Sequence, residues 1–271
     1  MRYPSFHPLA RARRRSRRAF TLVELLSVIA IVAAIIALLL PAIQSMHRRA
    51  KSANCLANLR SLQQASLAYS TDEAGWLIDA RLPHGGLEQG SAESFVDVLA
   101  RRGYCDTTQI RSPLDDSPHW SAEDGGDGVP VQGTTAVYRR TSYGLNNHLA
   151  REFSPWAAID PSLATDRLTK VGHHANTVQM LAMATTGPFA GADHPHVEGW
   201  GGGAASPVIA ASEVEIASVS QGAPTAVSES NWSFLDGHVE TARFASIYSG
   251  ELRNRLDPRV SSVYPNTASP Q

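Results

Sequence analysis

Glu24 is the one ionisable residue in the most apolar stretch of the chain, between Phe20 and Leu40. A carboxylate at the centre of a membrane-spanning helix costs about 2.5–3.5 kcal/mol, and less near the helix end, where it can reach the interface. A buried charge is tolerated when an opposite charge pairs with it. The position therefore indicates either an interfacial glutamate with no further role or a carboxylate that pairs with a cation.

Histidines are the second candidates for chemistry. Four of them flank the apolar segment at residues 177–183: His173, His174, His194 and His196. His-rich tracts can bind metal, but their spacing supplies no complete ligand set, so we expect loops here. His238 follows Asp236 closely enough for acid–base chemistry, although we expect this pair to stabilise a turn.

Residues 121–128 carry carboxylates that could hold calcium, but their spacing matches no EF-hand, and we expect a solvated loop. The sequence contains no G-x-S-x-G, H-E-x-x-H or P-loop motif. We therefore expect a protein that is not an enzyme and needs no cofactor. A membrane-anchored enzyme that uses the histidine-rich region is the alternative.

The element that carries Glu24 has the length of a membrane span. At about 1.5 Å per residue, a helix from Phe20 to Leu40 is about 30 Å long, which matches the hydrocarbon core. Residues 1–19 contain seven arginines and no acid. Because basic flanks stay in the cytoplasm, we expect one pass through the inner membrane with the remaining chain outside. That remainder has more acidic than basic residues, which argues against a nucleic-acid partner.

Apolar residues recur at helical spacing beyond Pro41, and no glycine occurs before Gly75. We predict one helix from about Phe20 to about Tyr69, which spans the membrane in residues 20–40 and is amphipathic in residues 41–70. Residues 71–254 predict an α+β domain in which an antiparallel sheet packs on this helix. Residues 1–19 predict a basic leader and residues 255–271 a flexible tail.

Within the α+β domain, a short helix is expected at about residues 92–102 and strands near residues 141–147 and 177–183. The clearest element is a hairpin at residues 231–244. Asp236 and Gly237 suit a two-residue turn, since glycine tolerates a positive φ. In that register Phe234 faces Val239.

The stretch from Ala19 to Leu26 (AFTLVELL) resembles the N-terminal motif of type IV prepilins and of type II secretion pseudopilins. The resemblance implies that a prepilin peptidase cuts between Ala19 and Phe20, and that the new amine of Phe20 is methylated. Glu24 then pairs with the Phe20 amine of a neighbouring subunit in a filament. The family usually has glycine before the cut, where this chain has Ala19. Pro41 fits the family as a helix kink, or it ends the helix at the membrane exit.

Later segments are similar to a large group of pseudopilin-like proteins. Residues 55–60 (CLANLR) resemble the C-x-N-N-L-K/R stretch of its long helix, and residues 142–146 (SYGLN) its S-Y-G-x-N segment. The hairpin resembles the C-terminal H-x9-D-G segment, but Ala226 stands where the histidine would be. Cys55 and Cys105 lie on the oxidising side in this topology, where a disulfide between them is possible.

The resemblance implies a structural function as a subunit of a type II secretion pseudopilus or a type IV pilus-like filament. The partners it implies are the prepilin peptidase, other pilin or pseudopilin subunits and the inner membrane. The alternative is a periplasmic ligand-binding or adhesive domain that uses the pilin-like helix only as an anchor.

Overall fold

The computed structural model describes residues 20–82, 93–121, 123, 126–128 and 138–261. The chain divides into two units, residues 1–46 and residues 47–271. The helix α1 (Leu22–Asp72) begins in the first unit and ends in the second. The second unit, called the globular unit below, contains every other described helix and strand.

α1 confirms the long helix predicted from about Phe20 to about Tyr69. It continues through Pro41, so this proline does not end the helix. The helix ends before Gly75, which has a φ of 86° and donates its N–H to the Ser70 carbonyl oxygen at 2.7 Å. The residue before it, Ala74, is also left-handed with a φ of 52°, and this turn brings the Gly75 N–H onto a carbonyl of the last helical turn.

The globular unit contains one antiparallel sheet of four strands in the order β1-β2-β3-β4. The strands are β1 (Tyr143–Leu145), β2 (Val178–Ala182), β3 (Glu229–Phe234) and β4 (Val239–Arg243). Neighbouring strands in the sheet are also consecutive in sequence, and the first three are almost entirely buried. Together with α1, the sheet confirms the predicted α+β class.

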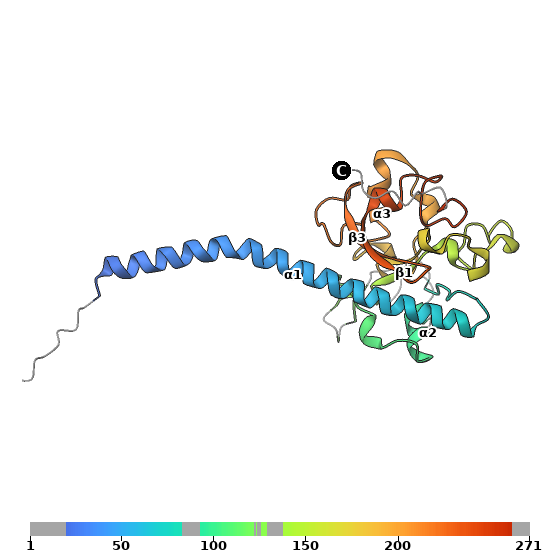
Figure 1. The fold of residues 1–271 in the computed structure, drawn as a ribbon, viewed down its shortest axis with the longest axis horizontal. Coiled ribbons are helices and arrows are strands. Elements are labelled where there is room, and N and C mark those ends of the chain that lie inside the picture. Colours follow the sequence, from blue (N-terminus) through green and yellow to red (C-terminus); the bar gives the residue numbers. More distant parts are fainter. Residues whose placement is uncertain (1–19, 83–92, 122, 124–125, 129–137, 262–271) are drawn as a thin grey trace, which may run out of the picture. The chain divides into compact units, whose positions relative to one another are not determined.

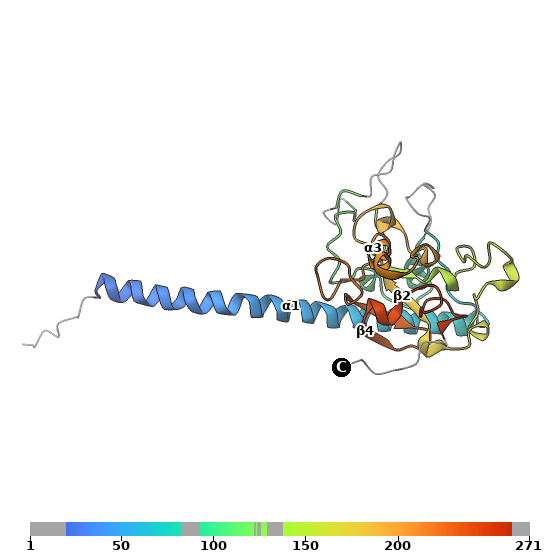
Figure 2. The same cartoon turned by 90° about the horizontal axis from the view of Figure 1, so that it is seen from above.

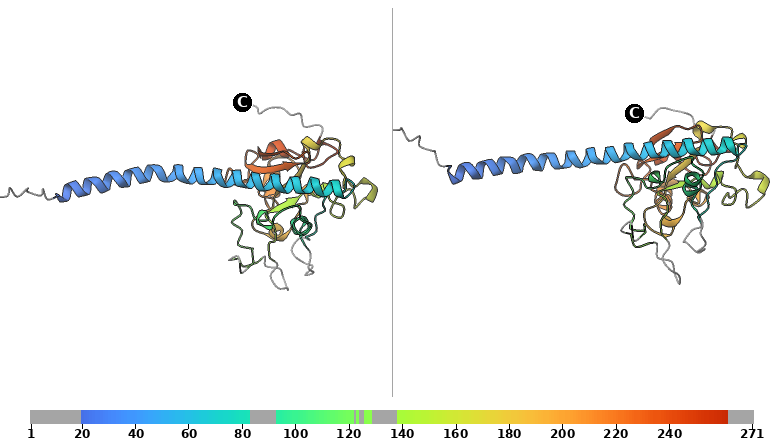
Figure 3. Two further views of the ribbon diagram at one scale, coloured as in Figure 1. Left: turned by 60° about the horizontal axis from the view of Figure 1, so that its bottom comes forward. Right: turned by 90° about the horizontal axis from the view of Figure 1, so that it is seen from below.

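The second half of α1 packs on one face of the sheet (Figures 1 and 3). Leu59 and Leu62 of the helix are fully buried in one cluster with Tyr143 and Met180 of the sheet. The short helix α2 (Phe95–Arg101) contributes to the same cluster. The predicted helix at about residues 92–102 is therefore present, and its apolar side chains cover α1.

Buried polar side chains fix how α1 lies on the sheet. Gln63 of the helix donates to the Gln179 side chain at 2.5 Å and accepts from Ser233 Oγ at 2.8 Å. The irregularity in β2 between Val178 and Met180 lets both Gln179 and Met180 reach α1. A shift of the helix would leave these buried groups unpaired, which costs about 1–3 kcal/mol for each.

The other face of the sheet is covered by loops, by α3 (Ser206–Ala211) and by α4 (Phe244–Ile247), and Figure 2 shows how much of this layer is loop. Its core includes the fully buried side chains of Trp200, Trp232 and Phe234. Eight 3₁₀ turns lie among the described residues: Thr107–Gln109, Asn147–Leu149, Pro161–Leu163, Leu168–Lys170, His174–Asn176, Pro188–Gly191, Val197–Gly199 and Gly203–Ala205.

The β1 strand has a glycine at position 144 because no side chain fits there. A Cβ at this position would lie 2.2 Å from the sulfur of Met183, which fills the space beside the strand. Tyr143 and Leu145, on either side of the glycine, belong to the cluster on α1. The strand predicted near residues 141–147 is thus confirmed, and its contact with the long helix is present.

The β3–β4 hairpin corrects the predicted register by one residue. Ser233, not Phe234, pairs with Val239. The Phe234 N–H donates to the His238 carbonyl oxygen at 2.9 Å, and the Gly237 N–H donates to the Phe234 carbonyl oxygen at 2.9 Å. The loop has three residues rather than two because Gly237, with a φ of 102°, takes the left-handed position of a G1 bulge.

The boundary predicted after residue 254 is also wrong, because the chain continues in the core through Ser261. Leu256 is fully buried, and its carbonyl oxygen accepts from Asn146 Nδ2 at 2.6 Å. The Ser261 hydroxyl is also buried, 3.0 Å from the Thr177 hydroxyl. The predicted flexible tail at residues 262–271 lies outside the described residues.

Candidate functional site

The N-terminus of α1 is a reciprocal capping box formed by Thr21 and Glu24. Glu24 Oε2 accepts from the Thr21 N–H and from the Thr21 hydroxyl, both at 2.9 Å. The Glu24 N–H donates to Thr21 Oγ1 at 3.2 Å. In such a box the two side chains satisfy backbone N–H groups that the first helical turn leaves without partners.

The capping box explains in part why the apolar segment contains a carboxylate at Glu24. Its carboxylate has donors within its own chain, and it lies where the helix dipole favours negative charge. All the hydrogen bonds of the carboxylate go to Oε2, so among the described residues Oε1 has none. Thr21 was missed as a functional residue from the sequence, although the T-x-x-E spacing is the signature of a capping box.

The first unit exposes apolar side chains on all sides of α1. The exposed fraction is 74% for Leu22, 55% for Ile29 and 50% for Ile35. An 18-residue window of α1 has a mean hydropathy of 2.9, and none of its residues is buried. Among the described helices, α1 is the one that is long and apolar enough to cross a membrane, by length and composition.

The residues of the expected cleavage site are only partly described. Ala19 and the arginine-rich segment before it lie outside the described residues. Phe20 precedes the capping box, and 77% of its surface is exposed. Its backbone lies next to Thr21 and about one helical turn before Glu24. An amine created at Phe20 would have the same position relative to these two residues.

The two cysteines do not form the disulfide that the sequence allowed. Both are free thiols in the structure. Cys55 is buried on α1, where Tyr143 donates its hydroxyl to the sulfur at 3.7 Å. The Cys105 sulfur contacts the Val96 carbonyl oxygen at 4.0 Å. Burial raises the pKa of the Cys105 thiol to about 11, so this thiol stays protonated at neutral pH.

The histidine-rich tract has structural contacts. His194 stacks on Phe153 with ring centroids 3.8 Å apart, and His174 Nε2 lies 3.0 Å from the Leu168 carbonyl oxygen. The neighbouring Asp193 is fully buried, and its carboxylate accepts backbone N–H groups from Arg81, Leu82 and Phe95. Among the described residues, no group of three or more histidine, cysteine, aspartate or glutamate side chains could hold a metal ion.

His238 stabilises the turn, as expected. Its Nδ1 lies 2.6 Å from Asp236 Oδ1, which also accepts the His238 N–H at 3.1 Å. The imidazole stacks on the Phe234 ring with centroids 4.2 Å apart and an interplanar angle of 2°. The acidic tract at residues 121–128, considered for calcium, lies partly outside the described residues.

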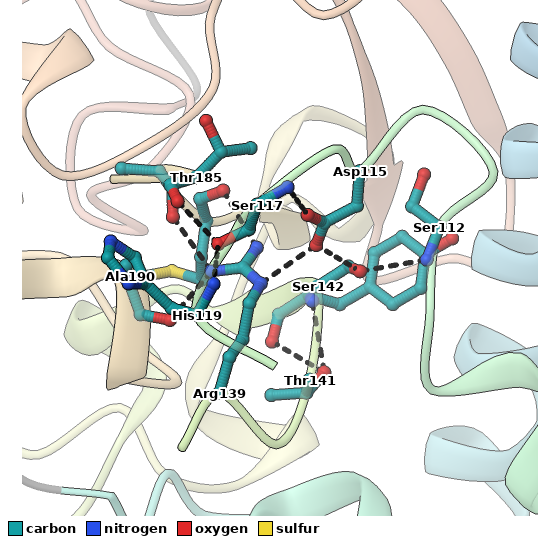
Figure 4. Close-up of polar contacts among 12 residues, drawn as sticks. Ser112, Asp115, Ser117, His119, Arg139, Thr141, Ser142, Thr185 and Ala190 are labelled. Carbon is teal, nitrogen blue, oxygen red and sulfur yellow. Dashed lines mark hydrogen bonds and ion pairs between the residues drawn. The ribbon is translucent and has the colours of Figure 1, made fainter. Parts of the chain in front are cut away.

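A buried ion pair between Arg139 and Asp115 organises the loops beside β2, as Figure 4 shows. Arg139 Nε donates to Asp115 Oδ2 at 2.8 Å, and Arg139 Nη1 donates to the carbonyl oxygens of Ala184 and Ala190, each at 2.7 Å. Asp115 Oδ2 also accepts from the Ser142 hydroxyl at 2.5 Å. Burial lowers the pKa of Arg139, and the Asp115 charge opposes this shift.

The Arg139 cluster was not found from the sequence. Its members are scattered along the chain, and no local spacing marks them. The pair connects three loop segments to the end of β2, so its role is to hold the globular unit together.

Comparison with known protein families identifies the N-terminal segment. Residues 14–40 match the family model of the prokaryotic N-terminal methylation motif. No curated protein and no solved structure matches the chain. The match covers the expected cleavage site and the apolar half of α1, and it supports a type IV prepilin- or pseudopilin-like protein. The motif implies processing by a prepilin peptidase, and with the apolar helix it is consistent with membrane anchoring.

Proposed function

We propose that this chain is a pilin-like structural subunit of a pseudopilus or type IV pilus-like filament. The leader is removed between Ala19 and Phe20, the Phe20 amine is methylated, and the mature chains assemble through their apolar helices. The observation that supports this most directly is the methylation-motif match over residues 14–40, together with a capped acidic first turn on an exposed apolar helix.

The charge of the leader supports the proposed topology. Its seven arginines precede the apolar helix, so the N-terminus is cytoplasmic and the globular unit lies on the other side of the inner membrane. Removal of these arginines leaves Glu24 as the one charged side chain near the start of the span. The same cut creates an α-amine, whose reference pKa is about 7.7–8.0, so it carries positive charge at neutral pH.

Pairing between Glu24 and the Phe20 amine of a neighbour is compatible with the capping box. Thr21 uses Oε2 of Glu24, which leaves Oε1 for a second donor. Two unit charges 4 Å apart attract by about 4 kcal/mol at an effective dielectric constant of 20. This pairing favours one stagger between adjacent helices, and Glu24 then sets the register of the filament.

Two Glu24 variants test assembly separately from membrane anchoring. Glu24→Gln keeps the shape and a capping oxygen but removes the charge, whereas Glu24→Asp keeps the charge and shortens the reach. We expect both to insert in the membrane, with filament yield strongly reduced by Glu24→Gln and partly retained by Glu24→Asp. Membrane fractionation and intersubunit cross-linking measure the two steps.

Intact-mass spectrometry of membrane-extracted wild-type chain should show the loss of residues 1–19 and the addition of one methyl group. A membrane-extracted chain that keeps residues 1–19, or filaments in normal yield from Glu24→Gln, would overturn the proposed function. Either result would favour a helix that acts only as an anchor.

A further inference from the structure

The globular unit contains a pocket of about 260 Å³ that the structural role of the chain does not use. Its walls come from the Asn147–Leu149 turn, the loop at Trp156, the Val197–Gly199 turn and the segment between Tyr248 and Val260. The last segment is held firmly, since the Val178 N–H donates to the Arg255 carbonyl oxygen at 2.7 Å. Pockets for drug-sized ligands measure about 300–1,000 Å³. This pocket therefore suits a smaller molecule, about the size of one sugar ring.

A buried histidine supplies a donor to this pocket. His148 is 3% exposed, and its Nδ1 lies 3.0 Å from Trp156 Nε1. Because the indole N–H can only donate, Nδ1 accepts and the imidazole proton is on Nε2. Burial lowers the pKa of His148, so the ring is neutral. None of the described residues accepts a hydrogen bond from Nε2, which leaves this N–H for a ligand in the pocket.

Carboxylates supply the acceptors. Glu198 is held by Asn147 Nδ2 at 2.7 Å and by His196 Nδ1 at 2.9 Å. Asp257 accepts from Arg259 Nε at 2.9 Å. These hydrogen bonds lower the pKa of both carboxyl groups against the opposing effect of burial, so both are ionised. Each carboxylate has about four lone-pair positions, so positions are left for a ligand.

The mixture of groups selects among ligand chemistries. An anion would meet ionised carboxylates, and the guanidinium of Arg259 is already paired with Asp257. An alkylammonium ion has no lone pair, so it could not accept a hydrogen bond from the His148 N–H. A hydroxyl group both donates and accepts, so several hydroxyls on one ring can use the whole set. Val197, Leu252 and Val260 add apolar wall that can cover the C–H face of such a ring.

We propose that this pocket binds a neutral polyhydroxylated ligand, a single sugar unit, with the His148 Nε2–H as donor and the Glu198 and Asp257 carboxylates as acceptors. The site would give a surface subunit the ability to attach to glycans. The binding does not depend on polymerisation, so its success or failure is separate from that of the proposed function.

The test uses the full-length protein in detergent and saturation-transfer NMR. The probes are the methyl glycosides of glucose, galactose, mannose and N-acetylglucosamine, with n-butylammonium and inorganic phosphate as charged controls. We expect at least one glycoside to bind and neither charged control to compete with it. Binding of none of the glycosides, or displacement of a glycoside by n-butylammonium or phosphate, would overturn the proposal.

Two variants locate the binding. Leu252 lines the pocket and is 77% exposed, so Leu252→Arg blocks the entrance without disturbing the core. Val227, which is 65% exposed and does not line the pocket, gives the matched control Val227→Arg. We expect Leu252→Arg to abolish the saturation transfer and Val227→Arg to leave it unchanged. Equal signals from both variants would show that the sugar binds elsewhere and would refute the site.

A third variant tests the acceptor. Glu198→Gln removes the charge and one acceptor oxygen, and we expect about fivefold weaker glycoside binding, as for the loss of one hydrogen bond of about 1 kcal/mol. Glu229→Gln, at a carboxylate outside the pocket, is its control. If Glu198→Gln binds as tightly as Glu229→Gln does, Glu198 is not an acceptor and the proposed donor–acceptor set is wrong.

Discussion

Removal of Arg139 is the perturbation for which the structure gives the clearest magnitude. Its guanidinium donates to Asp115 and to the carbonyl oxygens of Met183, Ala184 and Ala190. Arg139→Met keeps an unbranched apolar stem but removes the guanidinium group and all of these hydrogen bonds. It also leaves the Asp115 carboxylate, whose side chain is 3% exposed, without its opposite charge.

Breaking a buried ion pair from one side costs about 3–5 kcal/mol, because the remaining charge is buried without compensation. Ser142 and Ser117 still donate to Asp115, which keeps the expected loss within this range. A domain has a free energy of unfolding of about 5–15 kcal/mol. Arg139→Met should therefore remove about a fifth or more of the stability of the globular unit.

A double-mutant cycle with Asp115→Asn isolates the charge pairing. Once Asp115 is neutral, removal of Arg139 no longer strands a charge, so the double variant should lose about 1–3 kcal/mol less than the sum of the single variants. Urea unfolding of the full-length protein in detergent, followed by tryptophan fluorescence, measures these values. Trp120 is a suitable reporter, since its ring centroid lies 5.8 Å from the Arg139 guanidinium carbon.

The adjacent Arg140 provides the matched control. It forms an ion pair with Asp97 at 3.0 Å, but its side chain is 51% exposed. Arg140→Met should cost less than about 1 kcal/mol, as is usual for exposed pairs. Equal losses from Arg139→Met and Arg140→Met, or an additive cycle, would refute the argument that burial makes the Arg139–Asp115 pair important.

Three further predictions follow from the N-terminal segment and from one ion pair. Ala19→Gly should increase the cleaved fraction in pulse-chase labelling, since glycine is the usual residue of the family before the cut; an unchanged rate would show that Ala19 does not limit processing. Thr21→Val removes the hydroxyl of the capping box and should destabilise the first turn by about 1 kcal/mol. Faster amide hydrogen exchange at Glu24 and Leu25, whose N–H groups donate to Thr21, would reveal this loss, whereas Thr21→Ser should behave as wild type. The hydrogen bond between His196 and Glu198 raises the pKa of His196, while the pKa of Glu198 is lowered by hydrogen bonds that outweigh the opposing effect of burial. The contribution of the pair to stability is therefore complete between the unfolded values of 4.5 for Glu and 6.5 for His, and it is lost as the pH rises through the raised pKa or falls through the lowered one. Thermal unfolding of wild type and His196→Asn across pH should differ most in this window, by about 0–1 kcal/mol because the pair is partly exposed; a difference that grows above it would contradict the sign.

The features that the sequence determined are those that local chemistry encodes. The long helix follows from helical spacing of apolar residues without glycine, and it ends at Asp72, just before the left-handed residues Ala74 and Gly75. The apolar run and the arginines predict a membrane segment, and the Phe-Thr-Leu-x-Glu motif predicts a processing site. The match of residues 14–40 to the methylation motif supports a prepilin-like protein. The capping role of Thr21 could also be predicted from the sequence, because a capping box has a fixed spacing.

Hairpin register lay at the limit of this local information. Asp236 and Gly237 predict a turn. However, a two-residue turn and a three-residue turn with a G1 bulge both accept glycine at a positive φ. Packing decides between them, since Trp232 and Phe234 enter the core on one face of the sheet while Val239 contacts the cluster on α1. The residues set the type of element, and the two cores on either side of the sheet set its register.

Only the tertiary structure decided the contacts between distant segments. Arg139 and Asp115 form a buried pair, Leu256 and Ser261 enter the core, and Cys55 and Cys105 stay apart as free thiols. The pocket at His148 likewise needs segments that are far apart in sequence. Such contacts depend on the relative positions of whole elements, which local spacing does not encode, because the energy that selects them comes from burial and charge pairing in the assembled core.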